Sequence, residues 1–269
     1  MTTRVLPAET AFDKAAPTYD DEFEHLPATR RLRRSVWEIY YKYFHPGDTL
    51  LELNCGTGTD AIELASNGMH IVATDASAEM VAVTRRKIQG TALHAMITPM
   101  QLPFQRLREL AHQRFDGAYS NFGGLNCTGR LELVATDLAA LVKPGKYVVV
   151  CLLSDFSLWE TAAFLMRGKW KKAFRRREPL GVLADVKGEK VWVRYYAPET
   201  VKKMFSPFFV LVEMKGLNIF SPPPSSQLTH RILGRGVRVL EALDASLPKN
   251  TRMQTWGDHV VYVFRRAGG

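Results

Sequence analysis

The chain has 269 residues, of which 46% are hydrophobic and 23% charged, and its formal net charge at pH 7 is +9. These fractions are close to the averages of globular proteins, which excludes a chain that is disordered as a whole. No apolar run is long enough to span a bilayer and the N-terminus lacks the apolar segment of a secretory signal, so we expect a cytoplasmic protein.

The first segment with helical periodicity is residues 29–44. Leu32 and Val36 recur at helical spacing, and the arginines of residues 30–34 are predicted on the opposite face. We therefore expect a helix that packs on a sheet and ends before Pro46.

Residues 50–75 carry the most informative pattern. They read LLELNCGTGTDAIELASNGMHIVATD and predict a strand, a loop with Gly56 and Gly58, a helix, and a second strand that ends at Asp75. Glycine lets backbone N–H groups approach a ligand closely, and a helix N-terminus favours negative charge. A carboxylate at the end of the second strand can accept hydrogen bonds from both hydroxyls of a ribose. The segment therefore predicts a nucleoside site.

Residues 56–61 also match the pattern G-x-G-x-x-A of dinucleotide-binding folds, so a nicotinamide cofactor is one candidate. Glu52, at the end of the first strand, disfavours it, because a carboxylate suits a cationic ligand and would repel a pyrophosphate. No tyrosine has a lysine four positions further on, so the Y-x-x-x-K pair of short-chain reductases is absent.

Strands and helices alternate from here to Leu153. Strands are predicted at 49–54, 70–74, 92–97, 115–120 and 146–153, and helices at 59–67, 77–88, 104–112 and 130–141. Such alternation implies a parallel sheet that is covered by helices on both faces.

The alternation breaks in residues 154–197, which contain a helical segment, the basic run 167–177 and the strand-like VWVRYYA. The last part of the chain predicts a helix at 198–205, a strand in FFVLVEMKGLNIF, a helix at 228–245 and a strand in HVVYVFRR.

Four motifs resemble, in order, those of class I S-adenosylmethionine-dependent methyltransferases of the small-molecule type. They are FDKAAPTYD at 12–20, the loop at 50–59, FDGAYSNFG at 115–123 and LVKPGK at 141–146. The resemblance implies a Rossmann-like, doubly wound α/β fold with a mostly parallel seven-stranded sheet and an antiparallel last strand. It also implies cofactor-covering helices in residues 1–45, a core in 46–153 and 198–269, and an inserted helical, basic cap in 154–197.

The same resemblance implies S-adenosylmethionine as the cofactor, with S-adenosylhomocysteine as the product. Glu52 would face the cationic amino-acid end, and Asn54, which replaces the first glycine of the motif, tolerates a positive φ. Thr98 stands where the family often has an acid for the adenine amino group. The residues expected to contact the cofactor are Phe12, Tyr19, Glu52, Asn54, Cys55, Gly56, Gly58, Asp60, Asp75, Ala76, Thr98, Pro99, Met100, Ser120 and Asn121.

The acceptor is expected between the end of the fourth strand and the insert. Phe122 and Asn126 follow that strand, and Trp159, Tyr195 and Tyr196 offer aromatic surface. The alternative for the aromatic residues is a place in the core, where they are commonly found.

Methyl transfer from a sulfonium requires alignment of the reacting groups, and a base only if the acceptor must lose a proton. His259 and Asp155 are the candidates for that role, and the alternative for Asp155 is the N-cap of the next helix. The three cysteines lack the spacing of a zinc site or the number for a disulfide framework, so we expect free thiols and no metal.

The sequence thus predicts a biosynthetic methyltransferase that acts by in-line displacement on oxygen, nitrogen or carbon of a small-molecule metabolite. The acceptor is expected to be hydrophobic, anionic or carrier-bound. The alternatives are an RNA methyltransferase, an NAD(P)-dependent reductase and a module that binds the cofactor without turnover. The basic run 167–177 predicts either contact with anionic lipid at a membrane surface or a solvated face, and one short run is too little for a nucleic-acid footprint.

Overall fold

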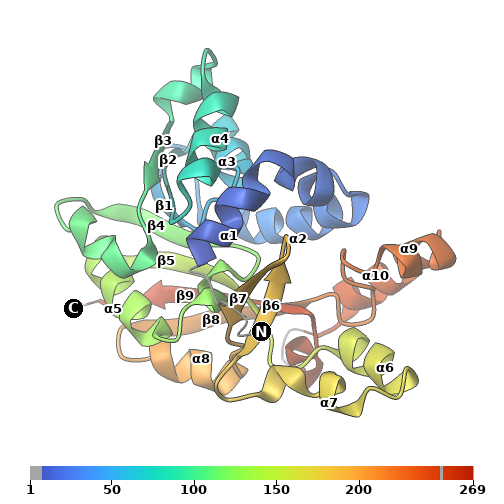
Figure 1. The fold of residues 1–269 in the computed structure, drawn as a ribbon. Coiled ribbons are helices and arrows are strands. Elements are labelled where there is room, and N and C mark those ends of the chain that lie inside the picture. Colours follow the sequence, from blue (N-terminus) through green and yellow to red (C-terminus); the bar gives the residue numbers. More distant parts are fainter. Residues whose placement is uncertain (1–7, 249–250, 269) are drawn as a thin grey trace.

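The computed structural model describes residues 8–248 and 251–268. Residues 1–7, 249–250 and 269, which the predicted terminal parts include, lie outside the described residues. At the centre is a seven-stranded sheet with the order β3-β2-β1-β4-β5-β9-β8 (Figure 1). Its strands are β1 (Thr49–Leu53), β2 (His70–Asp75), β3 (Ile97–Gln101), β4 (Phe115–Ser120), β5 (Val142–Leu153), β8 (Phe209–Leu217) and β9 (His259–Arg266).

β9 pairs antiparallel with both β5 and β8, and the pairs among β1 to β5 are parallel. This topology confirms the predicted α/β fold, a doubly wound and mostly parallel sheet with an antiparallel last strand. The carboxyl ends of β1, β2 and β4 therefore meet at one edge of the sheet, and the loops that follow them lie together.

Helices cover both faces of the sheet. One face is covered by α2 (Pro27–Tyr43), α3 (Thr59–Ser66) and α4 (Ala78–Ile88), and the other by α5 (Leu131–Leu141) and α8 (Pro198–Phe205). Side chains alternate along a strand, so β5 serves both cores. Val148 and Val150 join the core with α5 and α8, whereas Val149 and Cys151 join the core with α2 and α3.

The third strand begins later than predicted. Residues 92–97 were expected to be a strand, but Ala92–Ala95 form a 3₁₀ turn, in which the Thr91 hydroxyl accepts a hydrogen bond from the Leu93 N–H at 3.2 Å. The strand β3 follows at Ile97–Gln101 and includes Pro99. A proline lacks the N–H that a central strand needs, and it is tolerated here because β3 is at the edge of the sheet.

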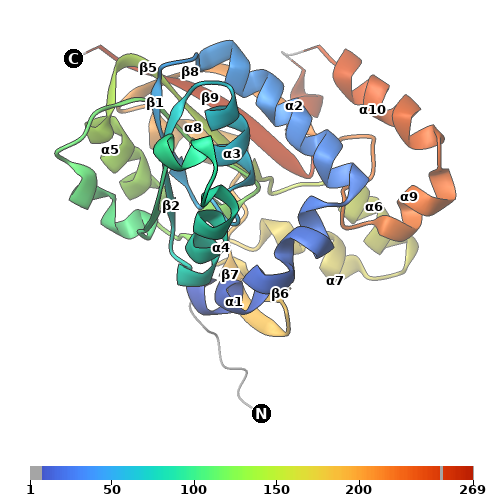
Figure 2. The same cartoon turned by 90° about the horizontal axis from the view of Figure 1, so that it is seen from above.

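Two segments far apart in sequence meet above the carboxyl edge of the sheet. They are α1 (Ala8–Ala15) and the hairpin of β6 (Val182–Val186) and β7 (Glu189–Val193), which lie side by side in Figure 2. Ala11 packs against Val191 and Val193, and ion pairs join Lys14 to Glu189 and Lys187 to Glu22. We call α1 and this hairpin the roof. The sequence pattern predicted β7 but not β6.

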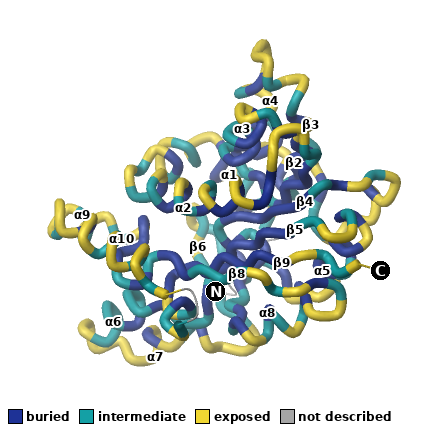
Figure 3. Tube along the Cα trace, turned by 180° about the vertical axis from the view of Figure 1, so that it is seen from behind, coloured by how far each residue is buried: buried dark blue, intermediate teal, exposed yellow. Residues whose placement is uncertain are grey.

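Helical elaborations flank the sheet at two further places. The 154–197 segment contributes α6 (Leu158–Met166) and α7 (Trp170–Ala173), and the link between β8 and β9 contributes α9 (Gln227–Leu233) and α10 (Gly236–Ser246). The single helix expected at 228–245 is therefore two helices, separated at Gly234, whose φ is 49°. These helices project from the body (Figure 3); α7, α9 and α10 have many exposed residues, whereas α6 is mostly half-buried. Short helical turns occupy Ala16–Thr18, Asp20–Glu24, Phe104–Leu110, Gly124–Cys127, Arg175–Arg177 and Arg252–Thr255.

Within the described residues, none of the helices has both the length and the apolar character needed to cross a bilayer.

Candidate cofactor and acceptor site

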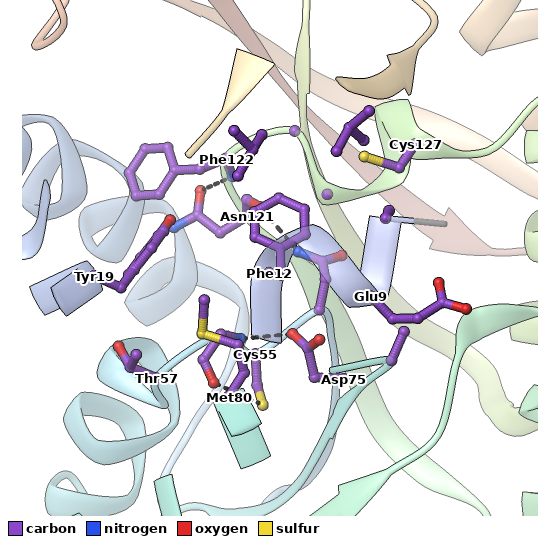
Figure 4. A pocket seen from close by; sticks show the side chains of 18 of the residues that line it. Glu9, Phe12, Tyr19, Cys55, Thr57, Asp75, Met80, Asn121, Phe122 and Cys127 are labelled. Atoms are coloured by element: carbon purple, nitrogen blue, oxygen red, sulfur yellow. Dashed lines mark hydrogen bonds between the residues drawn. The ribbon is translucent and has the colours of Figure 1, made fainter. Parts of the chain in front are cut away.

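A cavity of about 620 Å³ lies between the carboxyl edge of the sheet and the roof (Figure 4). The loops after β1, β2 and β4 form one side, and α1 with the β6–β7 hairpin forms the other. The nucleoside site that the glycine loop predicts and the acceptor site expected near the insert therefore share one enclosed space.

Asn54 holds the glycine loop against the end of β4. Its φ is 52°, which confirms the expectation that this residue takes a positive φ in place of glycine. Its side-chain oxygen accepts a hydrogen bond from the Ser120 hydroxyl at 2.6 Å, and its amide donates to the Asn121 carbonyl at 3.1 Å. The side chain fits because Gly124 faces it, where a Cβ would lie 2.2 Å from the Asn54 Cγ.

Asp75 lines the cavity with its carboxylate fixed by the backbone. One oxygen accepts from the Gly56 N–H at 2.8 Å and the other from the Ser77 N–H at 2.9 Å. Burial raises the pKa of Asp75, and these backbone donors oppose that effect. Each carboxylate oxygen has further acceptor capacity, which suits it to two neighbouring hydroxyls.

A buried arginine lies at the other side of the glycine loop. Arg33, on α2, was expected on the exposed face, but its side chain is only 7% exposed and forms ion pairs with Asp60, at 2.6 Å, and with Glu24. Its guanidinium also lies 4.6 Å from the centre of the Phe122 ring. Burial alone would lower the pKa of Arg33, but the charges of Asp60 and Glu24 raise it. The buried Nε of Arg33 has no hydrogen-bond partner among the described residues.

Asp60 also bonds a second side chain of α2 and one that follows β4. It accepts hydrogen bonds from the Trp37 indole at 2.7 Å and from the Asn121 amide at 2.9 Å. The wall near the start of α3 thus presents a cation and an anion side by side, a combination that suits a ligand with both charges.

The cavity wall beyond Asp75 is mostly apolar. Ala76, Met80, Leu102 and Phe104 line it, and Gln105 lies at its margin. Leu102 and Phe104 follow β3 directly in the segment QLPF. They were not among the residues expected at the site, although they come directly after a strand. Apolar walls of this kind suit a flat heterocycle.

The opposite end of the cavity is also apolar. Leu153 and Cys127 line it from the sheet side, and the hairpin contributes a run of side chains: Ala184, Val186, Val191, Trp192 and Val193. Burial raises the pKa of the Cys127 thiol to about 11, so the thiol stays protonated near neutral pH. Glu9 of α1 is the carboxylate that the roof contributes to the wall.

Comparison with known proteins identifies the family. Residues 50–145 match the family model described as "Methyltransferase domain". Over 60% of this chain and 72% of the relative, the sequence is 28% identical to the 2-phytyl-1,4-naphtoquinone methyltransferase of Synechocystis sp.. These matches support a class I S-adenosylmethionine-dependent methyltransferase. Its cofactor is S-adenosylmethionine, and neither match supports the NAD(P)-dependent reductase alternative.

Two further comparisons support the family and the fold. This chain is 34% identical to the demethylmenaquinone methyltransferase of Clavibacter sepedonicus over 40% of its own length and 42% of the relative. The solved DhpI–SAH complex has a TM-score of 0.59 at 13% identity and covers 97% of this chain and 95% of its own. At that identity the likeness shows a shared fold.

The structure of the methyltransferase brings most of the predicted cofactor residues to the cavity wall. Those that line it are Phe12, Tyr19, Asn54, Cys55, Gly56, Asp60, Asp75, Ala76 and Asn121. Those outside the lining are Glu52, Gly58, Thr98, Pro99, Met100 and Ser120. Gly58 instead begins α3, where a side chain would collide with Thr84, and Thr98 to Met100 lie within the edge strand before the chain reaches the cavity.

Glu52 needs a different interpretation. Along β1 it lies on the same face as Leu50, and it is buried at 2% exposure rather than facing the cavity. Burial, and then the charge of Asp60, raise the pKa of Glu52 well above its usual range. The carboxyl groups that reach the wall beside Arg33 are those of Asp60 and Glu24.

Phe122 is the one predicted acceptor residue that lines the cavity. Asn126 is fully buried and joins neighbouring segments, because its side chain bonds the Leu153 N–H and carbonyl and the Arg194 carbonyl. Tyr196 is also buried, and its hydroxyl donates to the Thr128 carbonyl. These residues shape the site from behind the wall.

The two aromatic residues nearer the insert have structural contacts too. The Trp159 indole donates to the Phe220 carbonyl, and the Tyr195 ring lies 4.9 Å from the Arg176 guanidinium. Trp192, from the same VWVRYYA segment, is the aromatic residue that reaches the cavity. Tyr195 and Tyr196 follow the end of β7 at Val193, so they lie outside the hairpin that lines the cavity.

Neither predicted catalytic residue lines the cavity. His259 packs behind Phe122, with ring centroids 5.7 Å apart, and its Nδ1 lies 3.0 Å from the Asp258 carboxylate. Asp155 is half-buried, burial raises its pKa, and the N-cap of α6 is Ser157 rather than Asp155. Within the described residues, no group of three or more His, Cys, Asp or Glu side chains is placed to hold a metal ion.

Proposed function

We propose that this methyltransferase transfers a methyl group, by in-line displacement, to an oxygen, nitrogen or carbon atom of a small and predominantly apolar acceptor. The observation that carries the proposal is the wall of hairpin side chains opposite the glycine loop, including Val186, Val191 and Trp192. The sequence relatives reported above are named for naphthoquinone and menaquinone compounds. A quinol ring is therefore the first acceptor chemistry to test. A biosynthetic role and a cytoplasmic location remain predictions.

The residues of the cavity fit S-adenosylmethionine. When bound, the cofactor supplies a methyl group on a sulfonium sulfur. Asp75 would accept hydrogen bonds from the ribose hydroxyls, and the apolar side chains of Met80 and Leu102 would contact the adenine ring. The unpartnered Nε of Arg33 supplies a donor for the carboxylate of the amino-acid end, and Asp60 an anion for its ammonium group.

The cavity residues contribute to methyl transfer by aligning the acceptor with the cofactor and by excluding water, rather than by transferring a proton. Among the described residues that line the cavity there is no histidine or lysine, and the acids are Glu9 of the roof, Glu24, Asp60 and Asp75. Holding the acceptor in line with the sulfur and the methyl carbon can itself supply several kcal/mol of the barrier. This favours an acceptor that ionises readily in water, as a quinol or an enol does, over one that needs a strong base.

Transfer of a labelled methyl group from S-adenosylmethionine tests the proposal. The expected result is labelling of a reduced naphthoquinone with a hydrocarbon substituent, and no labelling of total RNA. Because Trp192 lines only the acceptor side, Trp192→Ala should raise the KM for the quinol about tenfold and leave the affinity for S-adenosylhomocysteine unchanged. Labelling of RNA with none of the quinol would contradict the proposal and favour the RNA alternative.

A further inference from the structure

The segment of residues 166–183 exposes an unusual number of large apolar side chains. Met166 is 81% exposed, Leu180 80% and Trp170 67%, and Phe174 and Leu183 are each 44% exposed. Isolated apolar residues are common on protein surfaces, but five within eighteen residues on the surface of one insert mark an interaction site. We call the exposed residues of this segment the insert surface (Figure 3).

The insert surface is also strongly basic. Residues 166–183 contain seven lysines and arginines and one acid, Glu178. Two of these cations are already paired within the protein, because Arg175 and Arg176 pair with Glu160 of α6 and Arg176 also pairs with Asp258 beside β9. The basic run thus divides into an inner pair and outer cations.

The outer cations are available to a partner. Lys169, Lys171 and Lys172 are exposed, and no carboxylate in the described part of the chain forms an ion pair with them. With Gly168 and Trp170 they line a second hollow of about 430 Å³. Three ammonium groups around a shallow hollow attract an anionic headgroup.

The insert surface is continuous with the wall of the acceptor side. Leu183 pairs with Trp192 across the hairpin, and the Trp192 indole donates a hydrogen bond to the Leu180 carbonyl at 2.7 Å. Trp192 itself lines the cavity. A partner that covers Leu180 and Leu183 would therefore lie next to the roof.

We propose that the insert surface docks the methyltransferase on an anionic lipid bilayer. Exposed tryptophan and leucine side chains insert at the boundary between headgroups and acyl chains, and neighbouring lysines extend to the headgroup phosphates. Exposed apolar side chains mixed with lysines around a shallow hollow fit a bilayer better than an acidic protein. Docking places the β6–β7 hairpin, which lines the cavity, next to the bilayer, where an apolar acceptor would be dissolved.

Flotation with vesicles tests this docking without any methyl transfer. The wild-type chain should float with vesicles of phosphatidylcholine and phosphatidylserine, and much less with phosphatidylcholine alone. Each cation near such a surface contributes roughly fivefold to binding, so the triple variant Lys169→Glu, Lys171→Glu, Lys172→Glu should bind about 100-fold more weakly. The double variant Trp170→Ser, Leu180→Ser should also lose binding, and more so at high salt, where the charge contribution is screened.

A charge-matched control separates docking from the overall charge of +9. Arg86, Arg114 and Lys203 are exposed on α4, before β4 and on α8, and their reversal to Glu should leave flotation unchanged. Docking by the insert surface is overturned if the wild type stays with the unbound fraction, if the control loses as much binding as the lysine variant, or if the lysine variant floats like the wild type. Because flotation needs no acceptor, failure of the proposed methyl transfer would leave this result standing.

Discussion

Asp75 and Glu52 are carboxylates at the ends of neighbouring strands, yet their surroundings give them different properties. Asp75 lies on the cavity wall and is held by two backbone N–H groups, which stabilise its charged form. Glu52 lies in the core, where burial raises its pKa well above the usual range. Of these two acids, Asp75 is therefore the one placed to accept hydrogen bonds from a cofactor.

This difference predicts the effect of two substitutions on cofactor binding. Asp75→Ala removes an acceptor for the ribose and should weaken binding of S-adenosylhomocysteine by about 1–3 kcal/mol. Glu52→Gln changes a buried side chain that does not reach the wall, so the affinity for S-adenosylhomocysteine should stay within about twofold of the wild type. Isothermal titration calorimetry measures both. Equal losses for the two variants would restore Glu52 as a ligand and remove the special role of Asp75.

At the scale of elements, buried ion pairs join the 154–197 segment to the edge of the sheet. Arg176 is 6% exposed and forms ion pairs with Glu160 of the insert and Asp258 beside β9. It also donates hydrogen bonds to the Ser154 and Asp258 carbonyls, both at 3.1 Å. Arg176 and His259 hold the pKa of Asp258 well below its usual range, against the effect of burial.

Removing the central cation of this cluster should be costly. Arg176→Met leaves Asp258 buried without its main partner and should lower the free energy of unfolding by about 3–5 kcal/mol at pH 7. Lys171→Met, in the same basic run but exposed, should change it by less than about 0.5 kcal/mol. Urea unfolding followed by circular dichroism distinguishes them. Similar values for the two variants would mean that the cluster does not anchor the insert.

The elements that the sequence predicts well are those defined by local pattern. The glycine loop, Asp75 and the positive φ of Asn54 follow from residue type and spacing within about twenty-five residues. Elements set by distant partners were missed. Arg33 was placed on the exposed face because cations are rarely buried, but Asp60 approaches it from another helix and makes burial favourable.

The strand-level errors have similar causes. Glu52 is buried because β1 is a central strand that is covered on both faces, whereas the resemblance to a motif favoured a place facing the ligand. The packing of the hairpin could not be predicted, because it depends on α1, which lies more than 160 residues earlier in the chain. Asn126 was expected at the acceptor because it follows the fourth strand, and Tyr195 and Tyr196 because of the aromatic VWVRYY segment, of which Trp192 reaches the cavity.

For the whole molecule, the buried acid of β1 connects stability to pH. Because the pKa of Glu52 is raised in the folded state, the folded protein binds more protons than the unfolded chain above the ordinary glutamate pKa. The contribution of Glu52 is therefore most favourable below about pH 4.5 and is lost as pH rises towards the folded pKa.

Glu52→Gln removes this titration. Its melting temperature relative to the wild type should increase from pH 4 to pH 8, which differential scanning calorimetry at several pH values measures. The Glu63→Gln variant, on the outer surface of α3, provides a control with the same change of charge. A difference between Glu52→Gln and wild type that is independent of pH would contradict the assignment.

The roof has a consequence for the order of events in a catalytic cycle. One cover, fastened by the Lys14–Glu189 and Lys187–Glu22 ion pairs, extends over both the nucleoside end and the acceptor end of the cavity. Movement of this cover to release the spent cofactor would also admit water to the acceptor end of the cavity. Speed of turnover and protection of the reactants from water would then depend on the same movement, so a gain in one carries a cost in the other.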